Sequence, residues 1–278
     1  MTTRDAARAA QATQDPLVQL YQDAHLRIVQ EQQKLLSASP LRTARLRRLL
    51  ELQEAVQREM DRLDRRTNRW FERHGMEAYA AGFRHAAPDV SFTLIHDDAA
   101  RRLADDLFQD LLQATRYVRH DTKRFIRDAA KIAAQSTVID NTAVQAGRDM
   151  MKDLVQNHGI KAVTYRNGAK HPLGEYSQMT IRTKTAIAFS EGAFDSSPGV
   201  EWWECFDGPE CGLSFHEDPT QANGLIRTRD ESRGLLISHP NCRRSWGPRP
   251  DVTSKTGALK AQGTRAERLA AARHAVGR

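Results

Sequence analysis

The stretch Leu49-Leu-Glu-Leu-Gln-Glu-Ala-Val-Gln-Arg-Glu-Met-Asp-Arg-Leu63 decides the fold of this chain. Its apolar residues recur at intervals of three and four, which is the period of an amphipathic α-helix. They are Leu49, Leu52, Val56, Met60 and Leu63. The pattern predicts a helix from about Leu41 to Arg73. Its narrow apolar stripe is more typical of a core seam than of a binding face.

A second helix is predicted immediately upstream. Asp15-Pro16 is a typical helix start, because the acid can cap the first turn and proline is tolerated there. Apolar residues at helical spacing follow to about Leu36, and Ser37-Ala-Ser-Pro40 ends the pattern. The two helices predict an antiparallel hairpin arm over about residues 16–73. Residues 1–15 are expected to be a frayed lead.

Helical spacing returns over about residues 76–157, except at Ser91–Ile95, where we expect a short extended segment. The composition changes at Ile160. Apolar and β-branched residues predict strands at 162–165 and 199–203. Further helices are predicted at 172–191 and 264–275.

The fold class that follows is α+β and predominantly α. We expect a helical N-terminal region over residues 1–159, a small mixed α/β zinc-binding module over 160–252, and a basic C-terminal tail over 253–278.

The chain of 278 residues has a net charge of +7, a pI near 9.5 and a mean hydropathy of −0.64. No apolar run is long enough for a membrane span, and the N-terminus lacks the apolar stretch of a signal peptide. These features favour a cytoplasmic product that contacts polyanions or an acidic protein, and no membrane. Much of the positive charge lies on predicted helix faces, at Arg42, Arg45, Arg47, Arg48, Arg62, Arg65, Arg66 and Arg69.

All three cysteines lie in one window, residues 205–242, which we call the Cys/His window. Cys211-Gly-Leu-Ser-Phe-His216 and His239-Pro-Asn-Cys242 each place a thiolate and an imidazole a few residues apart, and tetrahedral zinc favours such ligands. We expect structural zinc on Cys211, His216, His239 and Cys242, with Cys205 as an alternative to His216. Unrelated buried cysteines, or a Cys205–Cys211 disulfide, are the other interpretations.

Four sequence motifs occur in a characteristic order. They are Tyr165-Arg-Asn-Gly-Ala-Lys170, Leu173-Gly-Glu-Tyr-Ser-Gln-Met-Thr-Ile-Arg-Thr183, Asp207-Gly-Pro-Glu-Cys-Gly212 and His239-Pro-Asn-Cys-Arg243. In this order they resemble the phage minor capsid proteins of the Mu-F-like head-morphogenesis group, over about Ile160–Val252. Several members have a second cysteine where this chain has Ser214, and many have a cysteine or histidine at the position of Arg244.

The resemblance implies a non-enzymatic virion component of low copy number inside the capsid, made in the host cytoplasm during assembly. Its partners would be the portal protein, other capsid proteins and nonspecific double-stranded DNA. Its role would be in head assembly, DNA packaging or DNA ejection.

Two other functional classes fit parts of the sequence. A zinc-dependent hydrolase or toxin-like effector would need an open metal position beside a base such as Glu204 or Asp207. A DNA-binding regulator would show sequence preference. No common catalytic signature is present, and we expect Trp202, Trp203 and Trp246 to form a small core rather than stack on bases.

Overall fold

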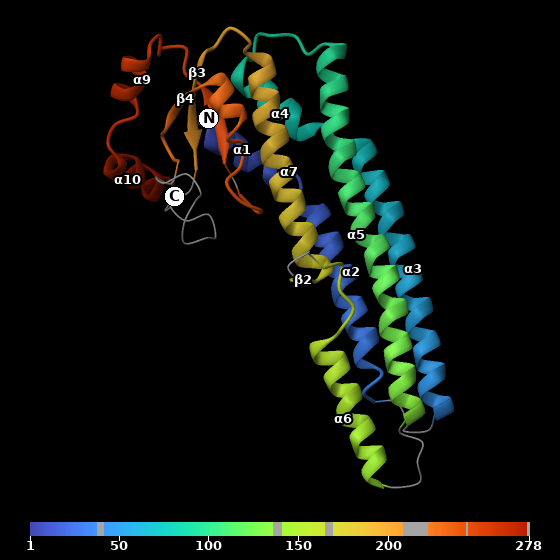
Figure 1. The fold of residues 1–278 in the computed structure, drawn as a ribbon. Helices are drawn as coiled ribbons and strands as arrows, with labels where there is room; N and C mark the ends of the chain where they lie inside the picture. The colour runs from blue at the N-terminus through green and yellow to red at the C-terminus, as the bar shows by residue number, and fades with distance from the viewer. Residues whose placement is uncertain (38–41, 136–140, 165–168, 208–221, 243, 277–278) are drawn as a thin grey trace. The chain divides into compact units, whose positions relative to one another are not determined.

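The computed structural model describes residues 1–37, 42–135, 141–164, 169–207, 222–242 and 244–276. It is mostly helical with small antiparallel sheets, so the predicted α+β, predominantly α class is confirmed (Figure 1). The elements are α1 (Thr3–Ala12), α2 (Asp15–Gln33), α3 (Arg42–His74), α4 (Glu77–Ala86), α5 (Leu94–Gln135), α6 (Asn141–Asn157), β1 (Val163–Thr164), β2 (Lys170–His171), α7 (Leu173–Ser196), β3 (Trp202–Phe206), β4 (Ile226–Thr228), α8 (Arg229–Arg233), β5 (Ser245–Pro248), α9 (Lys255–Ala261) and α10 (Arg265–Val276).

The chain forms two compact units, and their boundaries differ from those expected at residues 159/160 and 252/253. Unit 1 comprises Met1–Pro16, Trp70–Phe108 and Met179–Arg278, and unit 2 comprises Leu17–Arg69 and Gln109–Gln178. Helices α2, α3, α5 and α7 contribute residues to both units. A division by sequence composition cannot detect this, because composition changes along the chain whereas packing groups distant segments.

Unit 2 is built on the predicted helical hairpin. The stripe of α3 is its core, with Leu49, Leu52, Val56, Met60 and Leu63 all buried, as predicted. Polar contacts join α3 to α2 and to α5. The hydroxyls of Tyr21 in α2 and Thr67 in α3 lie 3.0 Å apart. Arg119 of α5 binds Asp61 at 2.9 Å and Asp64 at 2.7 Å, both in α3. Figure 1 shows α3 and α5 running alongside each other.

The same unit contains the first predicted strand. Val163 pairs with His171 and Thr164 with Lys170, which makes β1 and β2 a short antiparallel ribbon. The predicted turn Arg166–Ala169 lies largely outside the described residues.

Unit 1 contains a three-stranded antiparallel sheet of order β4-β3-β5. The predicted strand at 199–203 overlaps β3, which starts three residues later, at Trp202. Trp203 and Trp246 are fully buried and pack with Phe194 and Cys205. Trp202 packs partly buried against a second small cluster. The prediction that the tryptophans are core residues is therefore confirmed.

Helices α4 and α7 approach each other closely at two glycines. A Cβ atom at Gly82 would lie 1.8 Å from the Phe189 carbonyl oxygen, and one at Gly192 would lie 2.1 Å from the Tyr79 carbonyl oxygen. Only hydrogen fits between these backbones. Farther along α7, Phe194 packs on Trp203 of the sheet.

Two local predictions were wrong. Residues 1–15 are not a frayed lead, because Thr3–Ala12 form α1, with a capping box between Thr2 and Asp5. Its small apolar face packs on Phe189. Leu94 and Ile95 are not extended but open helix α5.

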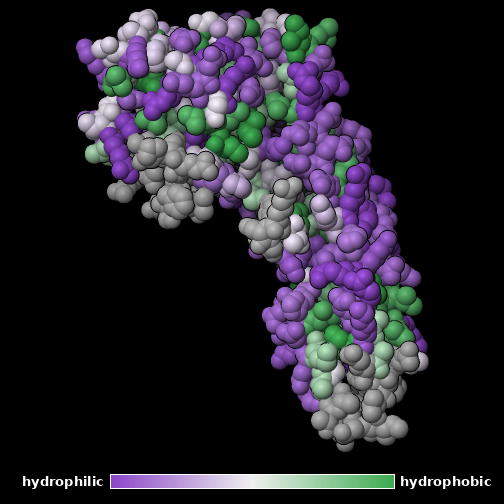
Figure 2. All heavy atoms as spheres, viewed as in Figure 1, coloured by the Kyte–Doolittle hydropathy of each residue, from purple (hydrophilic) through white to green (hydrophobic). Residues whose placement is uncertain are grey.

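No helix in the described part of the chain is long and apolar enough to cross a membrane. The face in Figure 2 is mainly hydrophilic, with separate hydrophobic patches, as expected from the low mean hydropathy.

Candidate functional site

The structure places half of the predicted metal ligands. His239 and Cys242 are described and buried, with 8% and 0% of their surfaces exposed. Cys211 and His216 lie in the segment 208–221, outside the described residues. The described residues can therefore test the His239–Cys242 half of the predicted set.

His239 and Cys242 lie on one tight turn. The Cys242 amide donates to the His239 carbonyl at 3.1 Å, and Asn241 between them has a φ of 68°. Asparagine tolerates this left-handed conformation better than most residues. The Asn241 amide donates to the Thr183 hydroxyl of α7 at 2.8 Å. The turn is thus fixed to α7 by a residue of another quoted motif.

The imidazole of His239 is oriented by its own turn. Its Nδ1 atom lies 2.8 Å from the Pro240 carbonyl oxygen. A carbonyl oxygen only accepts, so Nδ1 carries the proton in this contact. Metal-binding histidines commonly use this arrangement, in which the second ring nitrogen donates to a carbonyl. His239 and Cys242 therefore fit one half of a zinc site.

Cys205 occupies a different environment. It lies in the middle of β3, opposite Trp246 of β5, and its amide donates to the Leu225 carbonyl at 2.8 Å. Its side chain is fully buried in the tryptophan cluster. Within the described ranges, no group of three or more His, Cys, Asp and Glu side chains could hold a metal. The described residues thus do not bring Cys205 together with His239 and Cys242.

The two ends of the segment 208–221 are tied together. The Asp207 amide donates to Asn223 Oδ1 at 3.2 Å, and a guanidinium NH2 of Arg4 donates to the Asp207 carbonyl at 2.8 Å and also to Asn223 Oδ1. Burial lowers the pKa of Arg4, as does nearby Arg8, whereas Asp207 opposes the shift. The segment that contains Cys211 and His216 therefore begins and ends at a fixed base, which α1 helps to form.

A buried ion pair lies at the same base. Arg244 binds the Asp207 carboxylate through Nε at 3.2 Å and through NH2 at 2.9 Å, and both side chains have 0% exposure. Arg244 also donates to the Leu235 carbonyl at 3.1 Å and to the Ser238 hydroxyl. Arg244 is thus a buried structural cation at this base.

Sequence reasoning missed the roles of Arg4, Asn223 and Arg244. Arg244 and Asp207 are 37 positions apart. In the sequence, Asp207 begins one of the four motifs and Arg244 directly follows another. Neither position indicates that the two side chains form an ion pair.

The acids considered as catalytic bases are both engaged by arginines. Glu204 binds Arg249 at 2.8 Å, and Asp207 is held by Arg244. Asp251 and Glu204 together raise the pKa of Arg249 against the effect of burial. These carboxylates therefore act as anchors for neighbouring arginines.

A second polar cluster lies between α4, α7 and α8. Arg233 binds Asp195 at 2.5 Å and Glu191 at 3.1 Å, and the Tyr79 hydroxyl donates to Asp195 at 2.8 Å. Burial raises the pKa of Glu191, although Arg233 opposes this. Burial and the bond to Asp195 raise the pKa of Tyr79. These groups join α8 to the helices beneath it.

No protein-family model matches this chain, and no match was found among curated proteins or solved structures.

Proposed function

We propose that this chain is a non-enzymatic phage minor capsid protein that associates with the portal inside the head and aids assembly, DNA packaging or DNA ejection. The main support is that motifs quoted for the resemblance are bonded to one another. Thr183 accepts from Asn241, and Asp207 pairs with Arg244, the residue after the last motif. Motifs far apart in sequence thus contribute to one local structure, which is expected if their order reflects a shared fold.

Within that function, Cys211, His216, His239 and Cys242 hold a structural zinc ion. The support is the His239–Cys242 turn, which brings an imidazole and a thiol together on one short, hydrogen-bonded segment and orients the His239 ring through its Nδ1 bond to the Pro240 carbonyl. Four protein ligands close a tetrahedral site, which makes the ion a structural component rather than a catalyst. Such sites contribute on the order of 10–16 kcal/mol of apparent binding free energy in small modules.

Zinc measured in protein purified without chelators tests this part. We expect stoichiometric zinc in the native chain, loss of zinc in Cys242→Ser and in Cys211→Ser, and retention in Cys205→Ala, the matched control. Native protein without zinc would overturn the metal assignment. Loss of zinc in Cys205→Ala with retention in His216→Ala would make Cys205 the fourth ligand.

Portal association is assigned to exposed arginines of α3. Arg62, Arg66 and Arg69 are solvent-exposed, and Arg62 also binds the largely buried Glu59 at 3.2 Å. Long-range attraction to an acidic partner increases the association rate. These arginines would therefore bind an acidic surface on the portal.

The test is incorporation into heads when the chain is produced together with a phage portal protein and major capsid protein. Replacing Arg62, Arg66 and Arg69 by serine should strongly reduce the amount per head. Replacing Arg47 and Arg48, exposed on the same helix, is the control. Normal incorporation of the triple variant would refute this surface. Absence of the native chain from purified heads would refute the proposed function.

Point variants are preferable to a deletion of residues 1–73. Helix α1 packs on Phe189 and supplies Arg4 to the base of the segment 208–221. The deletion would therefore disturb unit 1 as well as the arm.

Nonspecific DNA binding is the second candidate, supported by the charge of +7 and the exposed arginines. Phosphate contacts make affinity salt-dependent and independent of sequence. Affinities for unrelated duplexes at two salt concentrations test it. A strong preference for one duplex would point to a regulator instead.

A further inference from the structure

A cluster of large apolar side chains is exposed where α5 begins. Val90, Phe92, Leu94 and Ile95 have exposed fractions of 46%, 39%, 84% and 76%. Isolated exposed leucines are common on protein surfaces, whereas several large apolar residues within six positions indicate an interaction site. We call these four residues the α5 knob.

The base of the α5 knob is fixed, although its tip is exposed. The Phe92 ring lies 5.1 Å from the Phe83 ring and 6.0 Å from the Tyr79 ring. His96 lies 4.4 Å from Phe83 and accepts a hydrogen bond from the Thr93 amide at 3.0 Å. Leu94 and Ile95 are thus held in position before any partner arrives, which reduces the entropy lost on binding.

Acidic residues flank the tip. Asp98 lies one helical turn after Leu94 and therefore on the same face. Asp89 precedes the knob and is exposed, as is Asp98. Arg101, on the next turn, is bound by Asp97 at 2.8 Å. The chemistry that fits the α5 knob is an apolar cavity with a basic rim.

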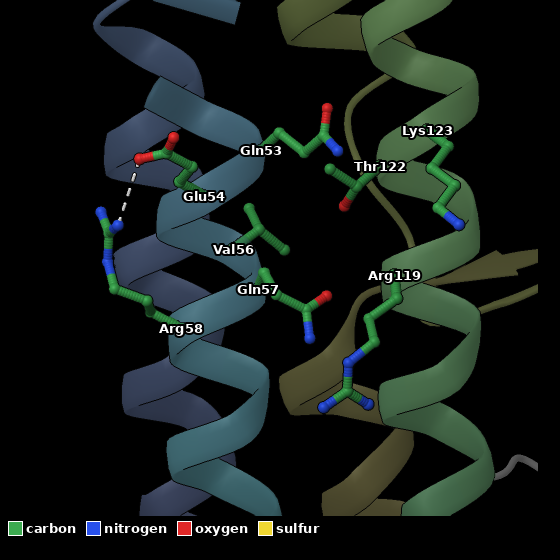
Figure 3. Close-up of a pocket in the computed structure, with 8 residues that line it drawn as sticks. All are labelled: Gln53, Glu54, Val56, Gln57, Arg58, Arg119, Thr122 and Lys123. Atoms are coloured by element: carbon green, nitrogen blue, oxygen red, sulfur yellow. Dashed lines mark hydrogen bonds and ion pairs between the residues drawn. The ribbon is translucent and has the colours of Figure 1, made fainter. Parts of the chain in front are cut away.

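Unit 2 contains a cavity with that chemistry. It has a volume of about 270 Å³ between α3 and α5 and is lined by Gln53, Glu54, Val56, Gln57, Arg58, Arg119, Thr122 and Lys123. Figure 3 shows Val56 between the two helices, with Arg119 and Lys123 extending from α5 and Arg58 on the α3 side, where it binds Glu54. Cavities for drug-sized ligands and cofactors are commonly larger, about 300–1,000 Å³. This one is better suited to one or two side chains.

The cavity is built on a rigid wall. Arg119 spans from α5 to Asp61 and Asp64 of α3, which fixes the spacing of the two helices. Asp64 and Asp61 counteract the effect of burial and raise the pKa of Arg119, so its charge is secure. Lys123 lies one turn after Arg119 on the same helix face and presents its ammonium group at the rim.

We propose that the α5 knob of one copy docks into this cavity of a second copy. Leu94 and Ile95 enter the space beside Val56, and Asp98 pairs with Lys123. The two surfaces are different, so the contact is head-to-tail, and repetition gives a closed ring or an open chain rather than a symmetric dimer. The inference does not depend on the proposed virion role.

Sedimentation of the full-length chain from low to high micromolar concentration tests self-association. We expect the native chain to form oligomers. Leu94→Asp should weaken association about tenfold or more, because it removes a buried leucine and places a second acid in the contact. Leu259→Asp is the matched control, since Leu259 is 58% exposed elsewhere in unit 1. Circular dichroism checks that each variant folds.

A mixing experiment distinguishes a head-to-tail contact from other arrangements. Leu94→Asp lacks a working knob, and Lys123→Glu lacks the basic rim of the cavity, so each variant alone should associate more weakly than the native chain. Mixing a knob variant with a cavity variant leaves one intact contact and should give dimers that do not grow further. The pair Asp98→Lys and Lys123→Glu in one chain should restore association lost in either single variant.

Three results would overturn the proposal. They are a native chain that stays monomeric at every concentration, equal weakening by Leu259→Asp, and mixed variants that remain monomeric. A monomeric native chain whose portal binding depends on Leu94 would instead assign the α5 knob to that partner.

Discussion

Removing one partner of the buried Arg244–Asp207 pair should be among the most damaging single substitutions in unit 1. Arg244→Met leaves the Asp207 carboxylate without the guanidinium that binds it at 2.9 Å, in a site with 0% exposure. Breaking a buried pair in this way costs about 3–5 kcal/mol. For a unit of this size the melting temperature should fall by roughly 6–20 °C.

The loss of stability in Arg244→Met should come mainly from the Asp207 carboxylate rather than from the other groups that Arg244 binds. The Leu235 carbonyl keeps a donor, since Trp246 Nε1 also binds it at 3.3 Å. Replacing both charges by apolar residues of similar volume, Arg244→Met with Asp207→Leu, should recover most of the stability, because no unpaired charge remains. A double-mutant cycle then isolates the pairwise term.

Trp203 and Trp246 are buried beside the pair, so tryptophan fluorescence during urea unfolding reports on this region. Arg249→Met is the control, because Arg249 keeps 24% of its side chain exposed and its ion pairs should contribute about 0–1 kcal/mol. The reasoning is refuted if Arg244→Met costs no more than Arg249→Met. It is also refuted if the double variant is as unstable as the single one.

Three further outcomes follow from the packing and from the pKa shifts. Gly82→Ala should destabilise the chain by about 1–3 kcal/mol or more in chemical denaturation, because the new Cβ atom would lie 1.8 Å from the Phe189 carbonyl oxygen. Gly199→Ala is the control and should be near neutral, because a Cβ atom there would have no other atom within 4 Å. Burial, together with Lys161, lowers the pKa of His25 in the folded state from its ordinary value of 6.5. The contribution of His25 to the free energy of unfolding is therefore full above pH 6.5 and is lost as the pH falls through the folded pKa. His25→Gln should flatten this part of a stability–pH curve. Burial raises the pKa of Glu191 in the folded state from its ordinary value of 4.5. The contribution of Glu191 to the free energy of unfolding is therefore full below pH 4.5 and is lost as the pH rises through the folded pKa. Glu191→Gln should therefore gain stability relative to the native chain at neutral pH but not below 4.5, and equal pH profiles would contradict the assignment.

The long helices were predictable from the sequence alone. The stripe Leu49–Leu63 specifies α3, and similar spacing specifies α2, α5, α6 and α7. Periodicity is a local property, so a single segment contains the information needed to identify it. The burial of Trp203 and Trp246 was also predictable, because large aromatic side chains in a small module have few other places to go.

Local patterns failed where the decisive partner is distant. The Ala-rich face of α1 is too weakly apolar to predict a stable helix, and it is stabilised by packing on Phe189 of α7. Leu94 and Ile95 have strand-like neighbours, but they join the helical continuation of α5.

The sequence by itself determined the helical class and the approximate positions of the long helices. Only the tertiary structure decided that Arg4 holds the base of the segment 208–221, that Thr183 holds the His239–Cys242 turn, and that Arg244 neutralises Asp207. These interactions join residues far apart in the chain. Their strength depends on burial and distance, which exist only once the helices and the sheet have packed.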